Sequence, residues 1–210
     1  MVQQKRRRNA DTSRKRLLEA AIKVFAKKGP EAATIDEISE KAGFNKRLTY
    51  HYFGSKEGLY KASLGQVYQQ FFTLEIKLSS MLLPAEKLLE ILVRRYYEFL
   101  RNHPEFVKMI CFENLNEGNV AKKLNLHGQK APVITALQLA LQKGQSEKRF
   151  RHDIDVTDLL ISIFALCFFY FSNRYTISQL LGNKALSPAR LNKRIKSVVE
   201  LLLHGITFGK

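Results

Sequence analysis

Hydrophobic residues recur every three to four positions along almost the whole chain, and no stretch of useful length alternates apolar and polar residues. This spacing is that of amphipathic helices, whereas alternation would indicate strands. Gly29 and Gly43 follow apolar segments, while Pro84, Pro104 and Pro188 precede others. Proline suits the first turn of a helix because its missing N–H would have no partner there. The pattern predicts an all-α protein of about nine helices.

Capping residues and glycines bound the expected helices. Thr34, followed three positions later by Glu37, is a capping-box signal, and Ser55 and Asp155 are N-cap candidates. Pro132 lies inside an apolar pattern over residues 120–142, so it either kinks that helix or restarts it. The other helices are expected over about residues 12–29, 34–42, 45–54, 55–81, 84–100, 104–111, 155–181 and 188–203.

Residues 34–53 have the order of a helix-turn-helix. Ala42 is small enough for two helices to approach each other, and Gly43 can adopt the positive φ that the turn needs. Helical spacing turns five residues inward: Ile35, Ile38, Phe44, Thr49 and Phe53. It leaves four on the outside of the second helix: Lys46, Arg47, Tyr50 and His51. A helix led by two cations suits the major groove of DNA.

The charge balance indicates an anionic partner. The chain has 35 Lys and Arg against 19 Asp and Glu, a formal net charge of +16. Such an excess favours DNA, RNA or an acidic membrane surface, and it does not choose among them. Basic residues are dense in the first 16 positions, which form either a solvated terminus or an arm that contacts phosphates.

Other classes of protein are disfavoured. Two cysteines, Cys111 and Cys167, do not make a disulfide scaffold, and they suit a buried core better than a nucleophile. The apolar run at 159–171 is shorter than the roughly 20 residues that span a bilayer, and the N-terminus lacks the apolar segment of a secretory signal. Phosphate-binding, hydrolase and metal-site motifs are missing. We expect a cytoplasmic protein that is not an enzyme.

Residues 14–62 resemble the DNA-binding domain of the TetR family of bacterial transcriptional regulators. Six blocks at the family's spacing carry the resemblance: Leu18–Ala21, Phe25–Gly29, Thr34–Ile38, Lys41–Gly43, Tyr50–Phe53 and Ser55–Leu59. The resemblance implies a DNA-binding domain over residues 1–57 and a helical domain over 58–210 that binds a small molecule and forms a homodimer.

The resemblance also implies DNA contacts at Thr34, Lys46, Arg47, Leu48, Tyr50, His51 and Lys56, with Arg6, Arg7 and Arg8 on the basic arm. Thr34, Tyr50 and Lys56 match phosphate-contacting positions. Lys46, Arg47, Leu48 and His51 match positions that face the bases. Tyr50 could instead serve packing, and His51 could be merely solvated. Arg47 and Leu48 replace residues that are common in the family, so the operator sequence cannot be inferred.

The sequence of the second domain, residues 58–210, resembles known proteins less clearly than the first domain does. Residues 95–100, 103–107 and 113–115 resemble a TetR subgroup with diverse effectors. Candidate ligand contacts are Phe106, Ile110, Glu113, Asn114, Phe164, Phe168, Phe171 and Tyr175. The four aromatic residues of this set could equally form core, and Glu113 and Asn114 could cap a helix. The expected dimer contacts are Leu160, Leu191, Ile195, Val198, Val199 and Leu202.

The resulting hypothesis is a homodimeric repressor on a pseudo-palindromic operator, released by an unidentified small-molecule effector and needing no cofactor or metal. The two recognition helices would lie about 34–36 Å apart. An enzyme with a basic surface and a nucleic-acid or membrane binder without sequence preference are the alternatives.

Overall fold

The computed structural model describes residues 2–73, 83–126 and 132–208, with side chains from residue 10 onward except 132, 183 and 184. Helices account for nearly all of its regular structure, as expected, and one isolated bridge joins Phe150 to Thr207. The α-helices are α1 (Val2–Ala32), α2 (Ile35–Ala42), α3 (Lys46–Phe53), α4 (Lys56–Phe72), α5 (Ala85–Asn102), α6 (Pro104–Leu115), α7 (Pro132–Ser146), α8 (Val156–Ser172), α9 (Arg174–Leu181) and α10 (Pro188–Ile206). Two short 3-10 helices are η2 (Ala121–Leu124) and η4 (Asn183–Leu186).

The chain forms two compact units. The first comprises Met1–Gln70 and Lys108–Gly128, and the second comprises Phe71–Val107 and Gln129–Lys210. These units do not follow the expected division between residues 57 and 58, because most of α4 and the C-terminal part of α6 pack with the first three helices. The DNA-binding and regulatory assignment of that division stays a prediction.

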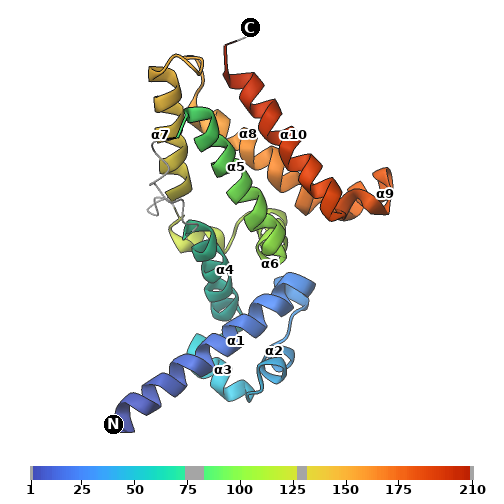
Figure 1. The fold of residues 1–210 in the computed structure, drawn as a ribbon. Helices are drawn as coiled ribbons and strands as arrows, with labels where there is room; N and C mark the ends of the chain where they lie inside the picture. The colour runs from blue at the N-terminus through green and yellow to red at the C-terminus, as the bar shows by residue number, and fades with distance from the viewer. Residues whose placement is uncertain (1, 74–82, 127–131, 209–210) are drawn as a thin grey trace. The chain divides into compact units, whose positions relative to one another are not determined.

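The core of the first unit explains its first three helices. Leu17, Phe25 and Ile38 are fully buried where α2 and α3 pack against α1 (Figure 1). Gly29 interrupts α1 with φ 79° and ψ 169°. A Cβ there would lie 2.8 Å from the Phe112 ring, so glycine permits both the backbone conformation and the close approach of that ring.

The second unit is built on four helices, α5, α7, α8 and α10, which lie side by side (Figure 1). Helix α5 contacts the other three, and its apolar face is buried from Ala85 to Leu100. The Tyr97 hydroxyl donates to the Leu191 carbonyl of α10 at 3.3 Å. Burial of these long apolar faces positions the helices.

Two expected helix boundaries were wrong. Helix α1 begins at Val2 instead of near Thr12. Of the two alternatives at Pro132, the restart is confirmed, because α7 starts afresh there. The helix expected over 155–181 breaks at Asn173 into α8 and α9, with a bend of 73°. Helix α4 ends at Phe72, and residues 74–81 of the expected 55–81 helix lie outside the described residues.

Among the described helices, none is by itself long and apolar enough to cross a membrane. Helices α8 and α9 would meet that criterion only together, across their bend.

Candidate nucleic-acid interface

The segment around α2 and α3 begins with a capped helix and a glycine turn. Thr34 Oγ1 accepts the backbone N–H of Glu37 at 3.2 Å, which is half of the predicted capping box. The Glu37 carboxylate does not return to Thr34 but pairs with Lys28 at 2.6 Å. Gly43 ends α2 with φ 74° and ψ 35°, the left-handed conformation expected from the sequence.

Helix α3 is set against α2 by a buried hydrogen bond. Asn45 caps its start by accepting the Leu48 N–H at 3.0 Å. Thr49 is 1% exposed, and its hydroxyl lies 2.7 Å from that of Ser39, which is also buried. This pair determines which side of α3 faces inward. The expectation that Ile35, Ile38 and Thr49 would be buried is confirmed.

The outward side of α3 carries the predicted contact residues. Helical geometry of about 100° per residue places Lys46, Arg47, Tyr50 and His51 within one face of about 140°. All four are exposed, and Leu48 is half-buried at the edge of this face. Lys46 lies 3.5 Å from Asp36 of α2, an exposed ion pair that DNA phosphate could replace at little cost. The face therefore offers two cations, a phenol and an imidazole to one groove.

Lys56 has a structural role that the sequence did not reveal. Its ammonium donates to the carbonyls of Glu31 at 3.0 Å and Ala33 at 3.3 Å, which ties the start of α4 to the end of α1. One N–H remains for another partner, so its predicted phosphate contact stays a prediction. Thr34 is exposed, and its hydroxyl proton can still be donated.

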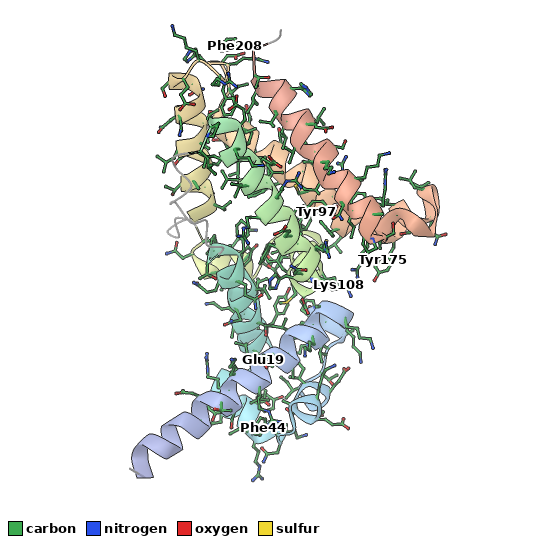
Figure 2. The ribbon with its side chains drawn as sticks, viewed as in Figure 1. Glu19, Phe44, Tyr97, Lys108, Tyr175 and Phe208 are labelled. Atoms are coloured by element: carbon green, nitrogen blue, oxygen red, sulfur yellow. The ribbon has the colours of Figure 1, made fainter. Side chains whose placement is uncertain are left out.

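Two arginines of the basic N-terminal region hold the turn. Arg16 donates to the Ala42 carbonyl at 3.0 Å, and its guanidinium lies 5.0 Å from the Phe44 ring. Arg14 lies 5.3 Å from the Phe53 ring. Phe44 and Phe53 are consequently covered by cations and only half-buried, instead of entering the core; Figure 2 labels Phe44 in this turn. The side chains of Arg6, Arg7 and Arg8 lie outside the described residues.

The expected ligand residues do not gather at one place. Phe106 and Phe164 both contact Phe71, at ring separations of 5.8 and 6.0 Å, and Tyr96 lies 4.9 Å from Phe164. We call this group in the second unit the aromatic cluster. Phe71 and Tyr96 were missed, although both belong to apolar helical patterns that could have suggested them.

The predicted aromatic stripe is interrupted. Phe171 packs on Tyr97 at 4.8 Å and Phe168 is half-buried, but Tyr175 lies beyond the break at Asn173 and is 66% exposed. Ile110, Glu113 and Asn114 belong to the first unit. The exposed Asn114 amide donates to the Ile110 carbonyl, whereas Glu113 is buried and binds two backbone N–H groups.

Most of the expected dimer contacts face the core of their own chain. Leu191, Ile195, Val198, Val199 and Leu202 are each at most 8% exposed, and Leu160 is half-buried. The apolar face of α10 was recognised correctly, and it packs within the second unit. The assignment of these five side chains to a dimer interface stays a prediction.

The cysteines are poorly suited to catalysis. Burial raises the pKa of Cys167 to about 12 and also raises the pKa of Cys111, so both thiols stay protonated. The described residues hold no group of three or more His, Cys, Asp and Glu side chains arranged to bind a metal ion.

Known proteins match both parts of the chain. Residues 17–63 match the model of bacterial regulatory proteins of the tetR family, and residues 84–202 match the tetracyclin repressor-like C-terminal domain. The transcriptional repressor NicS of Pseudomonas putida is 39% identical over 178 residues, 84% of each chain. The regulator RutR of Escherichia coli is 25% identical over 202 residues, 96% of this chain and 94% of RutR.

Solved structures agree on the fold. The regulator SCO4942 of Streptomyces coelicolor superimposes with a TM-score of 0.70 at 20% identity, covering 92% of this chain and 98% of that one. KstR2 of Mycobacterium tuberculosis gives a TM-score of 0.64 at 20% identity, over 93% and 95% of the two chains. The chain is a DNA-binding transcriptional regulator and not an enzyme, and it belongs to the TetR family.

Proposed function

We propose that this regulator is a homodimeric repressor that binds a pseudo-palindromic operator and is released by a small-molecule effector. The observation that carries the DNA-binding part is the exposed face of α3, with Lys46 and Arg47 at the start of a helix that Ser39 and Thr49 hold in place. NicS is named a transcriptional repressor, which supports repression as the mode of control. A regulator of bacterial DNA acts in the cytoplasm, where the chromosome lies.

Exposed apolar side chains support a dimer face on α8 and α10. Ile161 and Phe169 of α8 are 57% and 59% exposed, and Leu201 of α10 is 58% exposed. Such residues are typical of a face that a second subunit covers. Tyr175 and Phe208 are also exposed but lie at opposite ends of the second unit (Figure 2), so they extend beyond one compact patch. A twofold axis would present two α3 helices to successive major grooves, about 34–36 Å apart.

The aromatic cluster is our candidate for the effector's location. Phe71, Phe106 and Phe164 come from the end of α4, the start of α6 and α8, so a molecule inserted among them would shift these parts of the second unit. An effector that binds one arrangement of the dimer more tightly reduces DNA affinity, because only the other arrangement matches the operator spacing. The basic residues Arg6, Arg7 and Arg8 would add phosphate contacts that do not depend on sequence.

The test is genomic footprinting with the purified protein, followed by titration of the site found. We expect Arg47→Ala to weaken operator binding by about 1–3 kcal/mol and to relax the preference at one base pair. Arg190→Ala removes an exposed arginine from α10 and should leave binding unchanged. Equal affinity for operator and scrambled duplex at about 0.15 M salt would instead indicate a binder without sequence preference.

A further inference from the structure

A polar hollow lies within the first unit. It has a volume of about 310 Å³, and its walls are the end of α1, the first turns of α4, the end of α6 and the segment from residue 116 to 123. The residues that give it chemical character are Glu31, Lys56, Glu57, Tyr60, Glu113 and Lys123. It is separate from the aromatic cluster, which belongs wholly to the second unit.

Glu113 places a buried carboxylate in this hollow. Glu113 is only 3% exposed, and its Oε2 accepts the backbone N–H groups of Val120 at 3.2 Å and Ala121 at 2.8 Å. No Lys, Arg or His of the described residues forms an ion pair with it. Buried carboxylates are normally paired with a cation, because desolvation of an isolated charge is costly. The charge of Glu113 thus lacks its usual partner.

Tyr60 adds an unused hydroxyl beside this carboxylate. The residue is 3% exposed, and its buried hydroxyl has no hydrogen-bond partner in the described part of the chain. Burial raises the pKa of Tyr60, and the close approach of its hydroxyl to the Glu113 carboxylate raises it further, so the hydroxyl remains protonated. A buried polar group without a partner is uncommon and points to a ligand that would satisfy it.

The two lysines at the hollow already have partners. Lys123 pairs with Glu57 at 2.5 Å, and this lysine lowers the pKa of the Glu57 carboxyl. Lys56 donates to the carbonyls of Glu31 and Ala33. Lys56 keeps its positive charge, but the lining holds three carboxylates, Glu31, Glu57 and Glu113, against two lysines. The hollow therefore favours a cation, which would also supply the partner that Glu113 lacks.

We propose that this hollow binds a small organic cation with a primary ammonium group. The ammonium would donate one N–H to the Glu113 carboxylate and another to the Tyr60 hydroxyl oxygen, and its third donor can reach water or a rim carbonyl. Helix α4 starts three residues after α3 ends, so an occupant that contacts the first turns of α4 acts on the segment attached to the recognition helix. The site would be a second regulatory input, independent of the effector proposed for the second unit.

The probe is butylammonium, compared with butanol and butyrate as neutral and anionic molecules of nearly equal size. Binding to the full-length protein is measured without DNA, by NMR of ring-labelled tyrosine, so its outcome does not depend on the DNA-binding proposal. We expect butylammonium to shift the Tyr60 resonance with at least tenfold higher affinity than butanol or butyrate. Tyr60→Phe should weaken this binding three- to tenfold, followed on the backbone amides of residues 56–60, and Glu113→Gln should abolish it.

Tyr52→Phe is the matched control, since it makes the same change in the first unit, on α3, at a residue that does not line the hollow. It should leave butylammonium affinity unchanged. Tyr60→Phe removes a hydroxyl without a partner, so its melting temperature should equal that of the wild type, and this variant decides the question if Glu113→Gln does not fold. Equal butylammonium affinity in wild type and Tyr60→Phe, or butyrate binding as tightly as butylammonium, would overturn the proposal.

Discussion

The two short helices of the helix-turn-helix in the first unit and the long helices of the second unit are held in place by different interactions. Helices α2 and α3 have eight residues each, begin at Thr34 and Asn45 caps, and meet through the buried hydroxyl pair of Ser39 and Thr49. Helices α5 and α10 have 18 and 19 residues, and each buries a continuous apolar face.

Helix length explains this difference. An isolated helix shorter than about 12–15 residues is marginal in water, so α2 and α3 depend on caps, a turn glycine and one polar bond. A helix of five turns buries enough apolar surface to be held by packing. The comparison teaches that single polar atoms contribute most to the stability of α3, whereas buried apolar volume contributes most to the stability of the second unit.

The largest expected effect tests apolar packing in α10. Leu202→Ala should reduce the free energy of unfolding by about 2–5 kcal/mol, because Leu202 is 6% exposed and truncation leaves a cavity. The neighbouring Leu201 is 58% exposed, so Leu201→Ala should mainly weaken the dimer. Urea unfolding and sedimentation velocity at two protein concentrations separate the two effects.

The same pair of variants tests which side of α10 a second subunit covers. Equal, concentration-independent losses of stability in Leu201→Ala and Leu202→Ala would contradict the assignment of Leu202 to the core and Leu201 to the interface.

The next effect concerns the junction between α3 and α4. A Cβ at Gly58 would lie 2.2 Å from the Phe53 carbonyl oxygen, and that backbone atom cannot move without displacing the end of α3. We expect Gly58→Ala to destabilise the protein by about 3 kcal/mol, at the upper end of usual overpacking effects. Thermal unfolding followed by circular dichroism measures the loss.

Gly65→Ala is the control on the same helix, since its Cβ would make an ordinary contact of 3.6 Å with Leu124. It should be neutral or stabilise by up to about 1 kcal/mol through helix propensity. Similar losses of stability in both variants would contradict this explanation, because Gly65 is not near the Phe53 carbonyl.

The smallest effect isolates the polar bond between α2 and α3. Thr49→Val should cost about 2 kcal/mol, because it leaves the buried Ser39 hydroxyl without its partner. Adding Ser39→Ala should restore part of this loss, since an apolar pair has no unmet hydrogen bond. Urea unfolding of the four proteins of this double-mutant cycle gives the coupling; full additivity of the two losses would show that the bond does not secure α3.

The sequence predicted the helix-turn-helix closely because its signals are local. Thr34, Gly43 and Asn45 each act within three residues, so their roles follow from the order of residues alone. The exposed side of α3 followed from the same spacing. The break at Asn173 was missed because apolar residues continue on both sides and neither glycine nor proline marks it. There the Asn173 amide donates to the Phe169 carbonyl at 3.2 Å and ends α8.

What the sequence by itself determined is the family, the helices of the DNA-binding segment and the apolar face of α10. Only the tertiary structure decided that this face is buried by its own chain, that Arg16 and Lys56 bind backbone carbonyls, and that Tyr60 and Glu113 share one hollow. The reason is the range of the forces involved. Caps and turns act between neighbours in the chain, whereas burial and pairing depend on residues that only folding brings together.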